Sequence, residues 1–191
     1  MQQRYLPERA AMNRVNPVSN AMQHDKILAH LESRHARYVI LYRLGVESGL
    51  RVSDLLGLRA SHIRECQRVG SHTLTMIKTK TEITIQLSPE LLADIMAYIK
   101  AFKLRDNDAL FWSRPRDRRR PLTRQHVHRV MRAAGVATGL DRIGTHSMRR
   151  TFALQLYRQC GDMLEVQKAM GHKYISSTMC YMLDADRRLL L

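Results

Sequence analysis

The carboxy-terminal quarter of the chain reads THSMRRTFALQLYRQCGDMLEVQKAMGHKYISSTMCY over residues 145–181. Two helices are predicted within it, one over residues 145–159 and one over 162–170. Thr145 or Ser147 starts the first, which stops before Gly161, and Asp162 starts the second, which ends at Gly171. We therefore expect two helices joined by a short turn, so this end of the chain indicates a helical fold.

Helical signals continue towards the amino terminus. Further helices are predicted from Asp25 onward and over residues 36–46, 53–58, 89–99 and 122–134. The stretch over 36–46 is apolar nearly all round, so we expect it to be buried. Gly49 supplies a stop, Ser53 can cap the short helix that follows, and Ser88 with Pro89 marks the next helix start.

Between Ser71 and Leu87 the spacing of apolar residues changes from the helical pattern to every second residue. Ile83, Ile85 and Leu87 alternate strictly with polar residues after a charged turn over residues 78–81. This pattern predicts an antiparallel β-hairpin with lysines at its tip. The predicted fold class is therefore mainly α with a small antiparallel β-sheet or hairpin.

Composition excludes several classes of protein. The 191 residues, 45% apolar and 26% charged, suit one globular domain. The longest apolar runs have five residues, against the roughly 20 that a membrane span needs. The first 25 residues are charged and lack a secretory signal, and the three cysteines form no metal or redox motif. We expect a cytoplasmic protein with reduced cysteines and no membrane partner.

The charge points to a polyanionic partner. The chain has 32 Lys and Arg residues against 17 Asp and Glu, a net charge of +15. Over residues 114–132 eight arginines accompany one acid, Asp117, and guanidinium groups suit phosphate oxygens. We expect an arginine-rich loop ahead of Leu122 and double-stranded DNA as the partner, although a merely solvated loop stays open. The candidate DNA-binding residues are Arg114, Arg116, Arg118, Arg119, Arg120, Arg124 and Arg129.

Five polar signals follow one another along the chain. They are Gly49-Leu50-Arg51-Val52-Ser53-Asp54, the hairpin lysines, His146-Ser147-Met148-Arg149, Met170-Gly171-His172, and Tyr181 nine residues after that histidine. Each is weak alone, but together, in this order, they resemble the tyrosine recombinase (phage integrase) family over about residues 20–185. GLRVSDLLGL resembles the family's first arginine box, and the stretch quoted above resembles its second.

The resemblance implies the catalytic-domain fold of tyrosine recombinases, of the DNA breaking and rejoining type. It implies a catalytic set of Arg51, Lys78, His146, Arg149, His172 and Tyr181, with Asp54 as a supporting acidic residue. Lys80 stays an alternative to Lys78, because side chains two residues apart on an extended strand project to the same face.

These residue types suit cleavage of a DNA phosphodiester by a tyrosine. Negative charge grows on the non-bridging oxygens in the transition state, and Arg51, Arg149 and His172 can supply fixed donors. Free tyrosine has a pKa of about 10 and needs a base, for which His146 is the candidate. Lys78 is the candidate general acid for the departing 5′ oxygen. The resemblance implies a 3′-phosphotyrosyl intermediate and no ATP, metal or other cofactor.

We divide the chain into an irregular arm over residues 1–20 and a catalytic domain over 21–191, without the separate amino-terminal core-binding domain of most family members. In this the chain is similar to the stand-alone inverters of fimbrial phase switches. The resemblance implies inversion, integration or excision by a homotetramer on paired DNA sites, with an accessory DNA-bending protein left open. Two alternatives remain: type IB topoisomerase-like nicking and rejoining, and a DNA-binding regulator with the recombinase fold.

Overall fold

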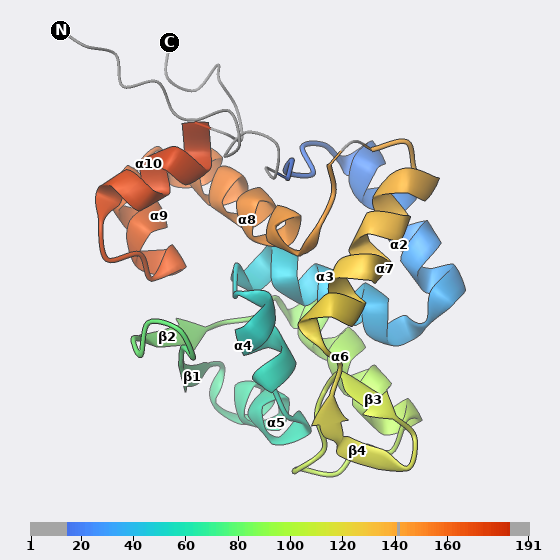
Figure 1. Cartoon of the computed structure of the whole chain (residues 1–191). Helices are drawn as coiled ribbons and strands as arrows, with labels where there is room; N and C mark the ends of the chain where they lie inside the picture. The colour runs from blue at the N-terminus through green and yellow to red at the C-terminus, as the bar shows by residue number, and fades with distance from the viewer. Residues whose placement is uncertain (1–14, 141, 184–191) are drawn as a thin grey trace, which may run out of the picture.

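Figure 1 shows the fold in a computed structural model that describes residues 15–140 and 142–183, apart from the side chains of Cys180 and Leu183. The elements in chain order are α2 (Ala21–Arg34), α3 (Ala36–Ser48), α4 (Val52–Gly57), α5 (Ala60–Val69), β1 (His72–Thr75), β2 (Glu82–Ile85), α6 (Pro89–Ala101), β3 (Trp112–Arg114), β4 (Asp117–Pro121), α7 (Arg124–Ala137), α8 (Thr145–Cys160), α9 (Met163–Met170) and α10 (Ile175–Leu183). The predicted fold class, mainly α with small antiparallel sheets, is confirmed. In the described part of the chain, none of the helices combines the length and apolar character that crossing a membrane requires.

Helix α3 lies at the centre of the molecule. It packs against α2, α6 and α8, which agrees with the prediction of a buried helix. In Figure 1, α8, α9 and α10 form one side of the molecule, and α2 and α7 form the other. The first hairpin lies below α9, and α4 lies between that hairpin and α7.

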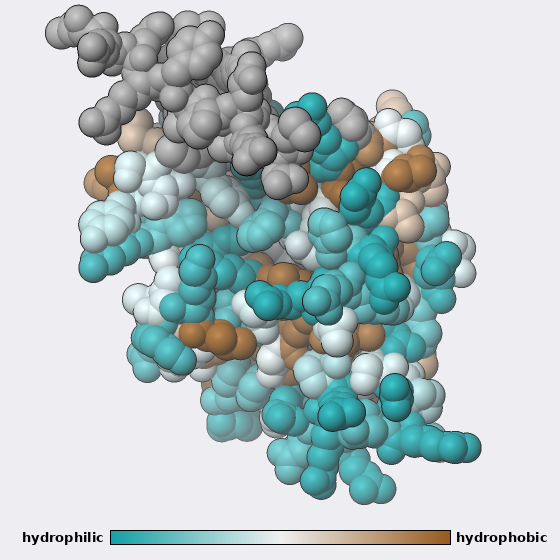
Figure 2. All heavy atoms as spheres, viewed as in Figure 1, coloured by the Kyte–Doolittle hydropathy of each residue, from teal (hydrophilic) through white to brown (hydrophobic). Residues whose placement is uncertain are grey.

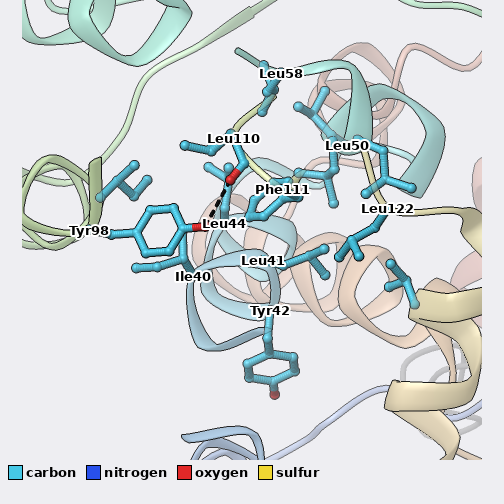
Figure 3. Close-up of a cluster of buried hydrophobic side chains, with 14 of the residues drawn as sticks. Ile40, Leu41, Tyr42, Leu44, Leu50, Leu58, Tyr98, Leu110, Phe111 and Leu122 are labelled. Atoms are coloured by element: carbon cyan, nitrogen blue, oxygen red, sulfur yellow. Dashed lines mark hydrogen bonds between the residues drawn. The ribbon is translucent and has the colours of Figure 1, made fainter. Parts of the chain in front are cut away.

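Two clusters of apolar side chains hold these layers together. The larger one is centred on α3, and Figure 3 shows Ile40, Leu41, Tyr42, Leu44, Leu50, Leu58, Tyr98, Leu110, Phe111 and Leu122 within it. Burying one such leucine or isoleucine stabilises the fold by about 1.5–3 kcal/mol. The smaller cluster joins α8, α9 and α10 and contains Ala153, Leu154, Val166, Met170 and Met182. Helix α8 joins the two clusters, because it contributes Met148 to the larger one and Ala153 and Leu154 to the smaller one.

Most predicted helix ends are found, and two local predictions are wrong. Ser88 caps α6 as predicted, and Gly49, Gly161 and Gly171 end helices in the left-handed conformation. However, Arg51 rather than Ser53 occupies the N-cap position of α4. The first described helix begins at Ala21, four residues before Asp25, because the Asn20 side chain accepts the Gln23 N–H and caps it there. Helices α5 and α10 have no counterpart among the predictions.

Both sheets are two-stranded and antiparallel. In the predicted hairpin, Leu74 pairs with Ile83 and Thr73 with Thr84. The second hairpin, formed by β3 and β4, corrects the expected arginine-rich loop. Trp112 anchors it, since Arg37 donates to the Trp112 carbonyl at 2.6 Å and its guanidinium carbon lies 4.0 Å from the indole centre.

The end of the expected amino-terminal arm lies against the domain. Residues 15–20 form no helix or strand, and residues 1–14 lie outside the described residues. Val18 is almost fully buried and belongs to the larger cluster.

Candidate active site

Arg149 lies at the centre of the candidate site, on the second turn of α8. Its side chain is buried and donates to the Gly49 carbonyl at 2.5 Å and to the Met170 carbonyl. These acceptors stand at the ends of α3 and α9, where helix carbonyls have no partner within the helix. Two helix ends therefore hold the guanidinium, and this fixes the direction in which its remaining N–H groups point.

Arg51 supplies a second guanidinium next to Arg149. It occupies the N-cap position of α4, directly after the turn that ends α3, and its Nη1 lies 3.0 Å from the Met76 sulfur. Burial and the charge of Arg51 lower the pKa of Arg149 to about 10. Both groups are charged at neutral pH, and the repulsion between them favours a bound anion.

The hydroxyl of Tyr181 lies 3.0 Å from His146 Nδ1. His146 is on the first turn of α8, and Tyr181 is on α10, which packs against α8. The Tyr181 ring also lies 5.6 Å from the His172 ring, measured between centres. The phenol is thus held between two histidines, with Arg149 close to its oxygen.

His172 is fixed at both ring nitrogens. Arg149 Nη2 lies 3.3 Å from Nε2, and Thr178 Oγ1 lies 3.0 Å from Nδ1. Because a guanidinium only donates, Nε2 accepts, and Nδ1 carries the proton that goes to the threonine. Thr178 is fully buried, so it orients the ring without contacting solvent.

The pKa shifts suit a neutral base next to a protonated phenol. Burial raises the pKa of Tyr181 above its usual value, and Arg149, Arg150 and Arg51 oppose that rise. Burial and nearby cations lower the pKa of His146, and the same causes lower the pKa of His172 to about 4. At neutral pH both histidines are uncharged, and His146 can accept the phenol proton.

The base of the first hairpin contacts Asp54 and Gly171, two residues next to the site. Asp54 Oδ1 accepts the Ile77 N–H at 2.9 Å, while its buried Oδ2 has no hydrogen-bond partner among the described residues. The Met76 side chain packs against Gly171, the residue before His172. A Cβ at Gly171 would lie 2.3 Å from the Met76 Cε.

The two candidate lysines differ in placement. Both are exposed, but Lys78 lies close enough to lower the pKa of His146. Residues 77–79 form a turn and Lys80 has a φ of 57°, in the left-handed region. The segment is not extended, so the argument that both lysines project to one face is wrong. The placement favours Lys78.

The candidate DNA-binding arginines form two groups. Arg114, Arg116, Arg119 and Arg120 are exposed on the second hairpin, and Figure 2 shows hydrophilic side chains over that end of the molecule. Arg118 differs, because it donates to the Phe102 and Lys103 carbonyls and lies 5.7 Å from the Trp112 ring centre.

The second group borders a groove of about 710 Å³. The groove is lined by Val52, Thr123, Arg124, Gln125, His128, Arg129, Thr145 and His146. It therefore joins the exposed basic face of α7 to the histidine that contacts Tyr181.

Sequence reasoning missed three residues that contact the site. They are Met76, Arg150 and Thr178. Arg150 was visible as the neighbour of Arg149, whereas Thr178 lies on a helix that was not predicted. Among residues 15–140 and 142–183, no group of three or more His, Cys, Asp and Glu side chains is arranged to hold a metal ion.

Comparisons with known proteins agree with this geometry. Residues 18–188 match the sequence profile of the phage integrase family. The probable integrase/recombinase YoeC of Bacillus subtilis is 32% identical over 176 residues, 92% of this chain and 93% of YoeC. Tyrosine recombinase XerD of Corynebacterium glutamicum is 26% identical over 93% of this chain and 57% of its own length.

A solved structure shows the same fold. The lambda integrase tetramer bound to a Holliday junction superimposes with a TM-score of 0.69 at 22% identity, over 92% of this chain and 49% of the integrase chain. The chain thus spans nearly all of YoeC and about half of the XerD and lambda integrase chains.

Proposed function

The chain belongs to the phage integrase family, and on this premise we propose that it is a site-specific DNA recombinase that acts through Tyr181. The contact between the Tyr181 hydroxyl and His146 Nδ1, next to Arg149, carries the proposal. It unites a nucleophile, a neutral base and an anion-binding cation in one place. A DNA-binding regulator without chemistry would not need this arrangement.

Cleavage follows from these positions. The Tyr181 oxygen attacks the DNA phosphorus and gives its proton to His146, so that the oxygen–phosphorus bond to tyrosine forms as the bond to the 5′ oxygen breaks. Arg51 and Arg149 donate to the non-bridging oxygens, where charge grows. Lys78 gives a proton to the departing 5′ oxygen. Rejoining is the reverse reaction, in which a 5′ hydroxyl attacks the 3′-phosphotyrosyl bond.

The DNA path is set by the basic groups outside the site. The groove between α7 and His146 brings Arg124 and Arg129 to the backbone near the cut phosphate. The four exposed arginines of the second hairpin extend the contact along the duplex, because Arg forks bind phosphate bidentately. We assign Arg118 a structural role instead, because it donates to two backbone carbonyls.

Recombination needs cuts on two duplexes, so we propose that four copies act together on paired sites. The lambda integrase structure, a tetramer on a Holliday junction, supports this assembly. An accessory DNA-bending protein stays a further candidate partner. We expect the enzyme to work in the cytoplasm, where its DNA would lie.

The test is a covalent adduct. The protein is incubated with nicked duplexes that carry inverted repeats from the DNA around its own gene, and SDS-resistant protein–DNA species are measured. Wild type should form the adduct and Tyr181→Phe should not. Tyr174→Phe is the matched control, since Tyr174 is 61% exposed and lies outside the site. An adduct that persists in Tyr181→Phe, or an absence of adduct on DNA that the wild type binds, would contradict the proposal.

A further inference from the structure

The segment before α2 is fixed to the first turns of the active-site helix. We call residues 15–18 the docked segment. The Val18 N–H donates to Thr151 Oγ1 at 2.8 Å in a buried bond, and the Asn16 N–H donates to the Arg142 carbonyl at 2.9 Å. Val15 packs so closely that a Cβ at Gly144 would lie 3.0 Å from its Cγ1.

Arg150 connects this segment to Tyr181. Its Nη1 donates to the Val15 carbonyl at 2.6 Å, and its guanidinium carbon lies 5.1 Å from the centre of the Tyr181 ring. The side chain is only 7% exposed. The face of an aromatic ring attracts a cation, and the attraction is strongest where water is excluded. One buried guanidinium thus joins a backbone carbonyl of the docked segment to the ring of the tyrosine.

We propose that Arg150 is a positioning residue for Tyr181, and that the docked segment holds Arg150 in place through the Val15 carbonyl. The inference rests on the proposed role of Tyr181 as nucleophile. A long arginine side chain has many rotamers, and a fixed acceptor selects one of them. The selected rotamer orients the phenol ring and stabilises the phenolate that develops during attack.

The neighbouring groups show why Arg150 differs from the other cations. The phenol faces His146 and Arg149 from α8, Arg51 from α4, and His172 from the turn before α10. Under the proposed function, Arg51 and Arg149 share their charge with the DNA phosphate. Arg150 instead donates to the Val15 carbonyl and lies over the face of the Tyr181 ring. It acts on the nucleophile rather than on the phosphate.

The first experiment needs no DNA site. The pKa of Tyr181 is measured by NMR with ¹³Cζ-labelled tyrosine, and its signal is assigned with Tyr181→Phe. Arg150→Gln should raise the Tyr181 pKa, because it removes a nearby cation, and Arg150→Lys should raise it less. An unchanged pKa in Arg150→Gln would overturn the proposal. If the glutamine variant does not fold, Arg150→Lys is compared with wild type for loss of the ring contact, seen as a changed Tyr181 ring signal, and no change would overturn it.

The second experiment tests the docked segment in the full chain. Thr151→Val removes the acceptor of the Val18 N–H, whereas Thr151→Ser keeps it and serves as control. Single-turnover adduct formation on the nicked duplex should slow on the order of tenfold in Arg150→Gln and less in Thr151→Val, with DNA affinity unchanged. In the double variant the losses should not add, because both changes act through one side chain. Additive losses, or equal rates in the valine and serine variants, would overturn the role of the docked segment.

The two proposals fail differently. An adduct that survives Tyr181→Phe would refute the proposed function, whatever Arg150 does. Normal Tyr181-dependent cleavage with wild-type rates and tyrosine pKa in the Arg150 variants would refute this inference alone.

Discussion

His146 Nδ1 and the Tyr181 hydroxyl lie 3.0 Å apart, although 35 residues separate them in the chain. The contact exists because α8 and α10 pack together around the smaller apolar cluster. Under the proposed function, His146 is the proton acceptor for Tyr181, and the predictions below start from this contact.

Replacing His146 by glutamine should slow adduct formation by roughly 100- to 10,000-fold, the usual range for a lost general base. Affinity for the same duplex should stay within about twofold of wild type, since the neutral ring adds no net charge. Rates from single turnover and affinities from titration separate the two effects. A glutamine variant that cleaves at the wild-type rate would assign the base elsewhere.

The catalytic base should stay neutral, and cleavage active, at pH values below 6.5. The pKa of His146 is lowered, so the ring stays neutral at a pH where free histidine is half protonated. The acid limb of the pH–rate profile should therefore fall below pH 6.5, and it should disappear in His146→Gln. A limb centred above pH 6.5 would contradict the lowered pKa.

Stability should fall with acidification for a related reason. The pKa of His172 is about 4 in the folded chain, against an ordinary value of 6.5, so the unfolded state binds more protons between these values. The free energy of unfolding should decrease as the pH drops from 6.5 to 4. In His172→Gln this decrease should be smaller, as measured by urea unfolding at several pH values.

Thr178→Val should weaken the site from outside it. The change leaves the partly buried Nδ1 proton of His172 without its threonine acceptor, at a cost of about 1–3 kcal/mol. Adduct formation should slow as the ring loses its orientation. Thr178→Ser keeps the hydroxyl, and it should retain most of the activity; equal behaviour of the two variants would argue against a hydrogen-bonding role.

The sequence predicts the elements whose ends carry caps or stops, and it predicts less where tertiary contacts decide. Helix α6 begins at the capping residue Ser88, α8 ends at Gly161, and α9 has a local signal at each end, Asp162 and Gly171. Strand β4 reads DRRRP and has no alternating apolar face. Its pairing depends on Trp112 of the neighbouring strand, which is held by Arg37 from a distant part of the sequence. Helix α10 is rich in Ser and Thr, residues that favour caps and turns over helix interiors. It forms because its buried side packs on α8 and α9.

The candidate site divides in the same way. The resemblance of the motifs to the family identified Arg51, His146, Arg149, His172 and Tyr181, and the fold brings these five into one network of contacts. Spacing alone did not reveal Thr178 or Arg150, because their contribution is a contact with a neighbour rather than a pattern. The choice between Lys78 and Lys80 depended on the backbone of the turn, which residue types alone do not set.

Gly171→Ala should be more damaging than Gly161→Ala. Both glycines have positive φ, so each substitution carries a conformational cost of about 1 kcal/mol. At Gly161 nothing lies within 4 Å of the added Cβ, whereas at Gly171 it would meet Met76 and Ile83. The alanine at Gly171 should therefore destabilise the fold further and also reduce cleavage, by displacing the hairpin. Equal free energies of unfolding for the two variants would show that Met76 and Ile83 move aside without cost, and would contradict the prediction.

Arg119→Ala and Arg118→Ala should separate DNA binding from folding. Arg119 is exposed, and removing one phosphate contact should reduce the slope of log affinity against log salt by about 0.9. Arg118 is bound to backbone carbonyls, so its loss should lower thermal stability and leave that slope unchanged. A reduced slope in the Arg118 variant would place its side chain on DNA.

The two carbonyls that hold Arg149 belong to different halves of the molecule. Gly49 adjoins the larger apolar cluster, and Met170 lies within the smaller one. The side chain that we propose to bind the phosphate thus also joins the two halves of the molecule. A variant that lost Tyr181 could keep the fold, whereas a variant that lost Arg149 would also lose folding stability. In inactive relatives of this chain, we expect Tyr181 to be replaced more often than Arg149.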